Sequence, residues 1–281
     1  MEHIQFLPAC SAVAKYLWGF FNSNFFTAFA GAGAGAYGAQ VIITRLKNKE
    51  NLLKEIRDTN VAISLALQIT NVFFTFKSQH FKELYENYLD DKKRALDSLN
   101  GQDIKFEQYN KPIELLFQKD FKAFNPVAVP IESLKNTLFD NLSMNTKSIL
   151  AMCELEQSVC RFNSILLMRN NLIKEEMGAQ KTLEQKQSLH EMLDYFGIDI
   201  GNESVNTVYS DILESLDIDI DSSLFYGVFL IGELVKHGKA LVEKSGNKSL
   251  KINDPNFSKA VKGGLMPKDS NYDNWKSMFI S

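Results

Sequence analysis

The sequence predicts a mainly α-helical protein, with an N-terminal transmembrane helix running into a long helix, followed by a cytosolic α-helical bundle with an irregular C-terminal tail. Three observations support this fold class. No charged residue occurs between Lys15 and Arg45, although charged residues make up 23% of the chain. Apolar residues recur at helical spacing from Arg45 onward. The 281 residues include only six prolines and 15 glycines, which favours helices over strands.

The uncharged stretch runs from Tyr16 to Thr44, and its second part is long enough to cross a bilayer. As a helix, the 20 residues from Phe25 to Thr44 would span about 30 Å, the thickness of the hydrocarbon core. The phenylalanine, valine and isoleucine side chains each favour insertion by only about 0.3 to 0.6 kcal/mol, and the centre is glycine and alanine. We therefore expect a transmembrane helix of marginal hydrophobicity.

Small residues dominate the centre of this helix. Gly31 and Gly35 form a GxxxG pair, and alanines continue the small-residue rows at spacings of three and four. Such rows let two helix backbones approach closely within lipid. We predict helix packing through Ala28, Gly31, Ala32, Gly35 and Ala39. Two interpretations stay open, a self-associating helix that lines a pore as an oligomer and a poor anchor with incidental small residues.

The flanking charges predict how the segment is oriented. Lys15 is the one lysine or arginine before it, whereas Arg45, Lys47 and Lys49 follow it directly. Because positive residues stay on the cytoplasmic side, we expect the N-terminus outside and the rest of the chain in the cytoplasm. The marginal hydrophobicity also allows a second state, in which the helix is sequestered in a soluble complex and inserts only when released.

A long juxtamembrane helix is predicted for residues 45–100. Five residues fall seven apart, namely Leu46, Leu53, Asn60, Leu67 and Phe74. This spacing is a heptad seam, and a polar residue such as Asn60 within a seam typically determines helix register or oligomer state. The alternative is a helix packed within its own domain, with Asn60 bonded to a neighbouring backbone. The seam is only four heptads long, which favours the alternative.

Residues 101–130 are predicted to be an irregular connector, because prolines disfavour helix at and before their positions. A short helix is expected within it from Ile113 to Phe121. The helical bundle follows over residues 131–245. Its first helix begins at Ile131, after Pro130.

The second bundle helix is predicted from Thr146 to about Lys186, and four polar residues interrupt its apolar face, namely Arg161, Arg169, Asn170 and Asn171. The cluster fits a solvated edge, a buried polar network or a ligand contact, and Arg161, Arg169 and Asn170 are the candidates for contact to a partner or to a phosphate group. A solvated edge is the commonest of these. All three interpretations stay open.

The last part of the bundle is predicted as a short helix that ends before Gly197 and two further helices. The first of these two further helices includes Ile212 and Leu216, and the acidic stretch IDIDSS follows it. The other runs from Leu224 to Lys244, with Ser222 or Ser223 as its cap. Its apolar run is shorter than the roughly 20 residues a membrane span needs, so we expect a core helix.

The C-terminal tail, residues 246–281, is rich in turn-forming residues but carries spaced aromatic side chains. A disordered tail is depleted of such side chains. We therefore predict that the tail wraps over the helical body, or that it forms a docking surface for a partner. The predicted docking residues are Tyr272, Trp275 and Phe279.

The sequence contains no pattern of residues that indicates a reaction, so we predict no catalytic residue, no cofactor and no metal site. The four histidines have no His, Cys or carboxylate at ligand spacing. Gly33, Gly35 and Gly38 match GxGxxG, but a long charged helix follows where the second strand of a dinucleotide-binding unit should be. The net charge of −3 provides no global basic field, so direct binding of nucleic acid is not expected.

Several phrases resemble a loose group of bacterial single-span, membrane-anchored helical proteins, some of which are found in anti-phage defence loci, retron-type ones among them. The phrases are FFTAFAGAGAGAYGAQ, KEIRDTNVAISLA, FNPVAVPIESL and LLMRNNLI. The resemblance covers about two thirds of the chain, and its motifs include no catalytic signature. The resemblance implies a non-enzymatic toxin-like effector in the bacterial inner membrane, held inactive by a cytosolic protein or ribonucleoprotein from the same operon until infection.

Two further functions fit the same sequence. One is a membrane-tethered scaffold or adaptor that holds a cytosolic partner at the bilayer without any catalysis. The other is a membrane enzyme that uses Arg161, Arg169 and Asn170 as a phosphate site. In the effector interpretation the expected partners are the lipid bilayer, further copies of the chain and the operon-encoded partner.

Overall fold

The computed structural model describes residues 24–99, 117, 119–120, 122–179, 188–201, 205–247 and 249–279. Of the described residues, 79% are helical and none lies in a strand, so the prediction of a mainly α-helical protein is confirmed. The chain divides into two compact units, Met1–Glu55 (unit 1) and Ile56–Ser281 (unit 2). The predicted segment 1–15 and residues 16–23 of the predicted transmembrane helix lie outside the described residues.

Helix α2 (Asn24–Phe76) supplies all of the described part of unit 1 and continues into unit 2 at Ile56. Its first half combines alanine, the best helix former, with glycines that each cost about 1 kcal/mol relative to alanine. Its second half is rich in leucine, isoleucine and phenylalanine. The helix therefore changes composition between the two units.

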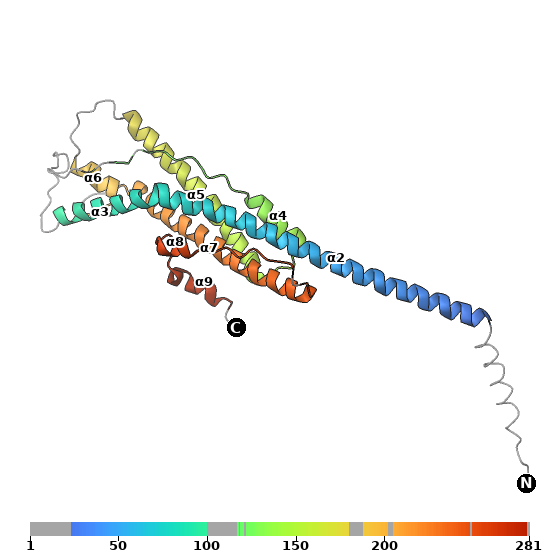
Figure 1. Ribbon diagram of the computed structural model, residues 1–281. Coiled ribbons are helices and arrows are strands. Elements are labelled where there is room, and N and C mark those ends of the chain that lie inside the picture. Colours follow the sequence, from blue (N-terminus) through green and yellow to red (C-terminus); the bar gives the residue numbers. More distant parts are fainter. Residues whose placement is uncertain are drawn as a thin grey trace, which may run out of the picture. The chain divides into compact units, whose positions relative to one another are not determined.

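A π-helical turn, η1 (Lys77–Phe81), separates α2 from α3 (Lys82–Leu99). The Lys82 N–H donates to the Lys77 carbonyl, five residues back, which is the π-helical pattern. The helix predicted over residues 45–100 therefore contains one wider turn. Figure 1 shows α3 continuing from α2 beyond this turn.

Helices α4 (Ile131–Asn141) and α5 (Thr146–Ala179) follow the connector. The α4 helix begins directly after Pro130, as predicted, because proline fits the start of a helix. Residues 142–145 separate α4 from α5. Asn145 acts as the cap of α5, since its side-chain oxygen accepts from the Ser148 N–H at 2.9 Å.

The described residues between α3 and α4 are extended, and asparagine side chains hold them on α5. Asn170 donates to the Phe124 carbonyl (2.6 Å) and accepts from the Phe124 N–H (3.1 Å). Asn163 does the same for Val127, at 3.1 and 2.8 Å. These side chains satisfy backbone groups that a regular element would otherwise pair.

The short helix predicted from Ile113 to Phe121 is wrong for Phe117, Lys119 and Asp120, which are not helical. Tertiary contacts replace the local bonds of a helix there, since the Asp120 N–H donates to the Tyr195 hydroxyl at 3.4 Å. The other residues of that predicted helix lie outside the described residues.

Helix α6 (Leu189–Phe196) has a capping box formed by Ser188 and Glu191 and ends at Gly197. Gly197 has a φ of 58°, a left-handed conformation that glycine adopts without strain. The predicted end of this helix is therefore confirmed.

Helix α7 runs without interruption from Val208 to Ser245, so the prediction of two helices separated by IDIDSS is wrong. The acidic residues stay within the helix because other helices supply cations. Asp221 pairs with Lys77 at 2.5 Å, and Asp219 pairs with Arg161 at 2.9 Å.

The core of unit 2 lies where α2, α5 and α7 pack side by side (Figure 1). Phe73 and Phe76 of α2 make edge contacts with Phe162 of α5, with ring centroids 5.2 and 5.0 Å apart. Helix α7 approaches α2 closely at Gly227, where an added Cβ would lie 2.5 Å from Thr70 Oγ1. Side chains of the C-terminal tail complete this core. The tail contains α8 (Ser258–Lys262), η3 (Asp269–Tyr272) and α9 (Asp273–Ser277).

Candidate functional site

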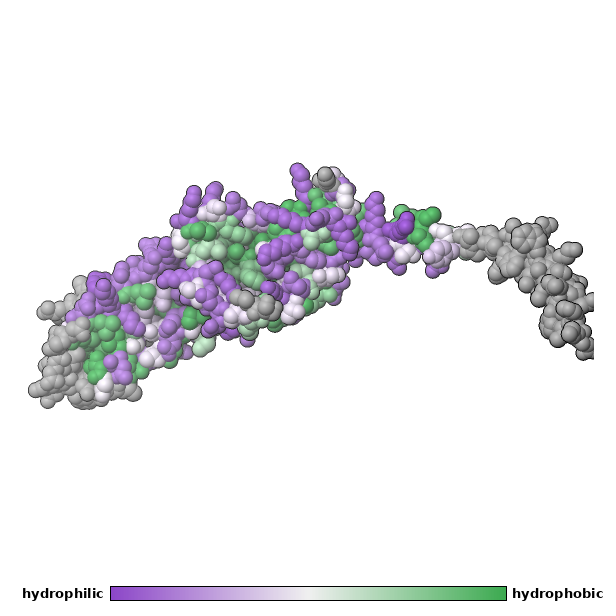
Figure 2. All heavy atoms as spheres, turned by 90° about the horizontal axis from the view of Figure 1, so that it is seen from below, coloured by the Kyte–Doolittle hydropathy of each residue, from purple (hydrophilic) through white to green (hydrophobic). Residues whose placement is uncertain are grey.

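The described part of unit 1 presents large apolar side chains that the chain itself does not cover. Tyr37, Ile42, Ile43 and Leu46 are between 60% and 74% exposed. Figure 2 shows hydrophobic atoms at the surface of this part of α2. We call residues 35–46 the exposed segment. Exposed large apolar side chains, where they gather, mark sites that bind a membrane, a protein or a ligand.

The small residues of the exposed segment also face open space. A Cβ built on Gly35 or on Gly38 meets no other atom within 4 Å, and Ala32 and Ala39 are exposed. Ala28 belongs to α2, as does Gly31, but their side-chain surroundings lie outside what the structure describes. Among the described residues, therefore, nothing occupies the small-residue face around Gly35.

One helix in the described part of the chain, Gly35–Leu99, contains a stretch long and apolar enough to cross a membrane, and it lies near the N-terminus. This finding rests on length and composition alone, and core helices and signal sequences share both properties. Half of the apolar stretch is buried. In unit 2 this helix contributes Ile63, Ile69 and Phe73, which are fully buried. The helix thus combines an exposed apolar part with a buried one.

Asn60 binds backbone within its own unit. Its side-chain nitrogen donates to the Lys251 carbonyl at 3.0 Å, and its side-chain oxygen accepts from the Asn253 N–H at 2.9 Å. Both partners belong to the C-terminal tail. The geometry matches the interpretation of a helix packed within its own domain.

Arg161, Arg169 and Asn170 do not converge on one site. Arg161 binds Asp219 of α7, whereas Asn170 forms hydrogen bonds with the backbone of Phe124. Arg169 is fully buried, so the solvated-edge interpretation is wrong for this residue. Arg169 belongs to a buried polar network.

The Arg169 guanidinium holds the connector against α5. It donates to the Lys122 carbonyl at 2.7 Å and to the Asp120 carbonyl at 3.3 Å. It also lies over the ring of Phe124, 5.0 Å from the centroid. Its Nε is buried with no hydrogen-bond partner among the described residues. The charge is thus committed to internal contacts.

Tyrosines surround this network and stay neutral at physiological pH. Burial raises the pKa of Tyr195 well above its usual range, and it raises the pKa of Tyr209 against the opposing charge of Arg169. Burial also raises the pKa of Tyr88 to about 12. Neutral hydroxyls can both donate and accept hydrogen bonds here.

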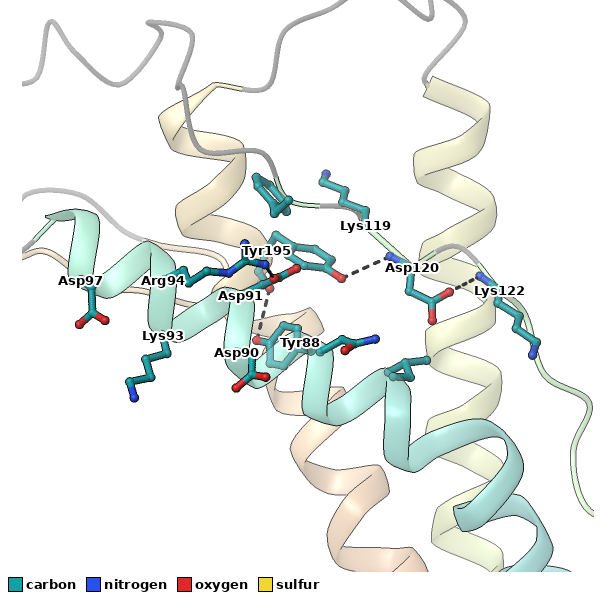
Figure 3. Close-up of a pocket in the computed structure, with 13 residues that line it drawn as sticks. Tyr88, Asp90, Asp91, Lys93, Arg94, Asp97, Lys119, Asp120, Lys122 and Tyr195 are labelled. Atoms are coloured by element: carbon teal, nitrogen blue, oxygen red, sulfur yellow. Dashed lines mark hydrogen bonds and ion pairs between the residues drawn. The ribbon is translucent and has the colours of Figure 1, made fainter.

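A cleft of about 1090 Å³ lies between α3, the connector and α6 (Figure 3). Tyr88, Phe117 and Tyr195 supply its aromatic surface, and most of its other lining residues are charged. The charged lining residues are Asp90, Asp91, Asp97, Asp120, Lys93, Arg94, Lys119 and Lys122. Nothing in the sequence singled out this set, because its members come from three separate segments.

The charges of the cleft are partly paired. Arg94 forms an ion pair with Asp91, and Lys119 lies 3.2 Å from Glu176. The described residues contain no group of three or more His, Cys, Asp or Glu side chains that could hold a metal ion. The arrangement offers contacts to a polar ligand that carries both signs of charge.

The three predicted docking residues of the tail meet α7 and each other. Tyr272 stacks on Phe225 with centroids 3.8 Å apart, and Trp275 meets the ring of Phe229 at 4.9 Å. Phe279 packs on Trp275 at 5.0 Å. These contacts cover an aromatic face of α7.

Comparison with protein-family models, with curated proteins and with solved structures found no match to this chain.

Proposed function

We propose that the protein is a membrane-acting, non-enzymatic effector that inserts or oligomerises through its glycine-rich helix and disrupts the bacterial inner membrane when a partner releases it. The observation that carries the proposal is the exposed segment, in which Tyr37, Ile42, Ile43 and Leu46 face solvent. Exposing these side chains to water is unfavourable. A lipid phase or further copies of the same helix would cover them.

The charge pattern supports a defined orientation for this proposal. Arg45, Lys47 and Lys49 follow Ile42 and Ile43 and are exposed. Basic residues at the cytoplasmic boundary bind anionic lipid headgroups, each contributing about 1 kcal/mol. The N-terminus would then lie outside and unit 2 in the cytoplasm, where it would meet a protein or ribonucleoprotein encoded nearby.

Replacing Ile42 and Ile43 together by aspartate tests membrane binding. An aspartate at the centre of a span costs about 2.5 to 3.5 kcal/mol, and near the end of a span the cost is smaller. We expect at least about tenfold weaker binding to vesicles of anionic phospholipid, where tenfold corresponds to about 1.4 kcal/mol, and loss of membrane depolarisation on induction. Val61→Asp is the control, since Val61 is 50% exposed on the unit 2 part of α2. Unchanged depolarisation in the double variant would contradict the proposal.

Gly35→Leu tests self-association separately from folding. Because an added side chain at Gly35 meets open space in the single chain, the substitution should leave the free energy of unfolding unchanged or slightly higher. In a packed helix pair the same side chain would separate the backbones. We expect loss of chemical crosslinking between copies in the membrane, with normal expression. Gly232→Leu on α7, which also meets open space, is the matched control.

The second candidate function is a membrane-tethered scaffold that holds a cytosolic partner at the bilayer. The cleft of unit 2 favours it, because its paired charges and aromatic surface suit a polar partner segment. In this case removal of residues 1–44 should leave partner binding intact, and induction of the full chain should not depolarise cells. Co-purification of the partner with the shortened chain, combined with the dye measurement, separates the two functions.

A further inference from the structure

The C-terminal tail crosses two helices that carry the core of unit 2. We call residues 249–279 the strap. It has three short helical pieces, α8, η3 and α9, joined by irregular segments. Its first residues contact α2, and its last residues contact α7. It therefore links two helices that are adjacent in space and distant in sequence.

The strap is attached to α2 by two hydrogen bonds between the Asn60 side chain and the strap backbone. The Asn60 amide donates to the Lys251 carbonyl and accepts from the Asn253 N–H. Further along the strap, Phe257 meets Phe74 with ring centroids 6.1 Å apart. These two contacts lie almost four helical turns apart on α2.

Gly238 of α7 is the point where α7, α2 and the strap meet. A Cβ added there would lie 2.7 Å from Ile252 Cδ1 of the strap and 3.1 Å from Thr59 Cγ2 of α2. Only a residue without a side chain leaves room for both neighbours. Close by, Lys239 and Asp254 form an ion pair at 2.7 Å.

The far end of the strap is anchored by aromatic contacts. Tyr272 stacks on Phe225, and Trp275 packs against Tyr226 and Phe229. The Tyr272 hydroxyl also lies 3.4 Å from Ser222 Oγ. Aromatic pairs of this kind add about 0.5 to 1.5 kcal/mol beyond the area they bury.

The strap nevertheless buries little of itself. Among its described residues only Pro267 and Trp275 are buried, whereas α7 alone buries 18 residues. Segments with few buried apolar contacts and exposed hydrogen bonds open locally, at a lower free energy than the core. The strap should therefore open before α2, α5 and α7 separate.

From these contacts we infer that the strap is a releasable latch that keeps the unit 2 part of α2 within the core and restrains membrane binding. The inference rests on the proposed function. Helix α2 is continuous from the exposed segment to Phe76, and half of the apolar stretch on the helix Gly35–Leu99 is buried. Opening the strap removes its contacts with Asn60 and Phe74 of α2. The part of α2 around Asn60 can then leave the core.

Thermodynamic reciprocity gives a test on the unaltered protein. If release of the strap favours membrane binding, membrane binding must favour release of the strap by the same factor. We expect amide hydrogen exchange over residues 249–279 to be about tenfold faster on anionic phospholipid vesicles than in solution, within the usual range of such couplings. The Asn253 amide is the reporter, because it donates to Asn60.

The same measurement separates a latch from general unfolding. Amides in the buried stretch of α7 around Leu224 and Leu230 should keep their protection on vesicles. Equal exchange of the strap in both states overturns the latch. Joint loss of protection in the strap and in α7 overturns it too, since the strap would then not open on its own.

Gly238→Leu provides the converse experiment. The new side chain displaces Ile252, so vesicle binding should rise about tenfold. Gly232→Leu is the control on the same helix, because a Cβ there meets nothing within 4 Å. Asn60→Ala, which removes the two bonds to the strap, should act in the same direction.

The outcomes distinguish the latch from the proposed function. If the wild type binds vesicles through Ile42 and Ile43 but neither Gly238→Leu nor Asn60→Ala binds more strongly, the latch is wrong and the membrane function stands. If neither the wild type nor the two variants bind vesicles, both fall.

Discussion

Two parts of one helix, residues 35–46 and residues 56–76 of α2, differ in what covers them. Both are apolar, yet Ile42, Ile43 and Leu46 are at least 60% exposed, whereas Ile63 and Phe73 are fully buried. The buried part packs on α5 and α7 within unit 2. The exposed part contacts no other element among the described residues of unit 1, where α2 is the only helix.

This difference shows that hydrophobicity alone does not determine which part of a helix is buried in the core. Full burial of a large apolar side chain contributes about 1.5 to 3 kcal/mol, and the chain gains this contribution at Ile63 and Phe73. At Ile42 and Ile43 the other described residues leave most of each side chain exposed, so little of this contribution is gained there. The exposed segment is therefore the part of the molecule where we place its interaction with membrane or with further copies.

The largest effect we expect is on the buried part. Phe73→Ala should lower the free energy of unfolding by about 3 to 5 kcal/mol, because it leaves a cavity against Phe162. Urea denaturation followed by circular dichroism measures this loss. Tyr37→Ala, at a side chain that is 74% exposed, should change the same quantity by at most about 0.5 kcal/mol. Similar losses at both positions would break the comparison.

A smaller loss of stability is expected when the Asn170 side chain is removed. Asn170→Ala leaves the N–H and the carbonyl of Phe124 unpaired, which should lower the free energy of unfolding by about 1 to 3 kcal/mol. Its neighbour Asn171 is exposed, so Asn171→Ala should remain within about 0.5 kcal/mol of the wild type. The same denaturation experiment measures both. Equal effects would mean that the hydrogen bonds between Asn170 and Phe124 do not contribute to the free energy of unfolding.

The smallest expected effect is a dependence on pH. Burial raises the pKa of Asp219 above its ordinary 3.8, and the Arg161 guanidinium only partly opposes this. The folded state then binds the proton more tightly than the unfolded state does. The stability of the wild type relative to Asp219→Asn should therefore be greatest below pH 3.8 and should fall as the pH rises through the folded pKa. A stability difference that is the same at acidic and neutral pH would exclude this effect.

Local sequence signals predicted several elements correctly. Pro130 precedes the start of α4, and Gly197 ends α6 in a left-handed conformation. These predictions succeed because proline and glycine restrict or extend the backbone angles of their own position.

Predictions about polar residues within apolar segments succeeded less well. The acidic stretch IDIDSS was expected to end a helix, and a solvated edge was one of three interpretations of Arg169. In both cases a distant segment supplies the partner, Arg161 and Lys77 for the aspartates and the connector backbone for Arg169. The cleft beside Tyr88 was not predicted, because its lining residues come from segments that are distant in the sequence.

The sequence by itself determined the mainly helical class, the helix boundaries at Pro130 and Gly197, and the uncharged stretch that ends at Thr44. It did so because backbone preference and hydrophobic spacing are properties of neighbouring residues. Only the tertiary structure decided that Asn60 binds the strap, that Arg169 is buried, and that one part of α2 is covered while another is exposed. These outcomes depend on which distant segments pack together, and only the folded chain determines which partners each side chain meets.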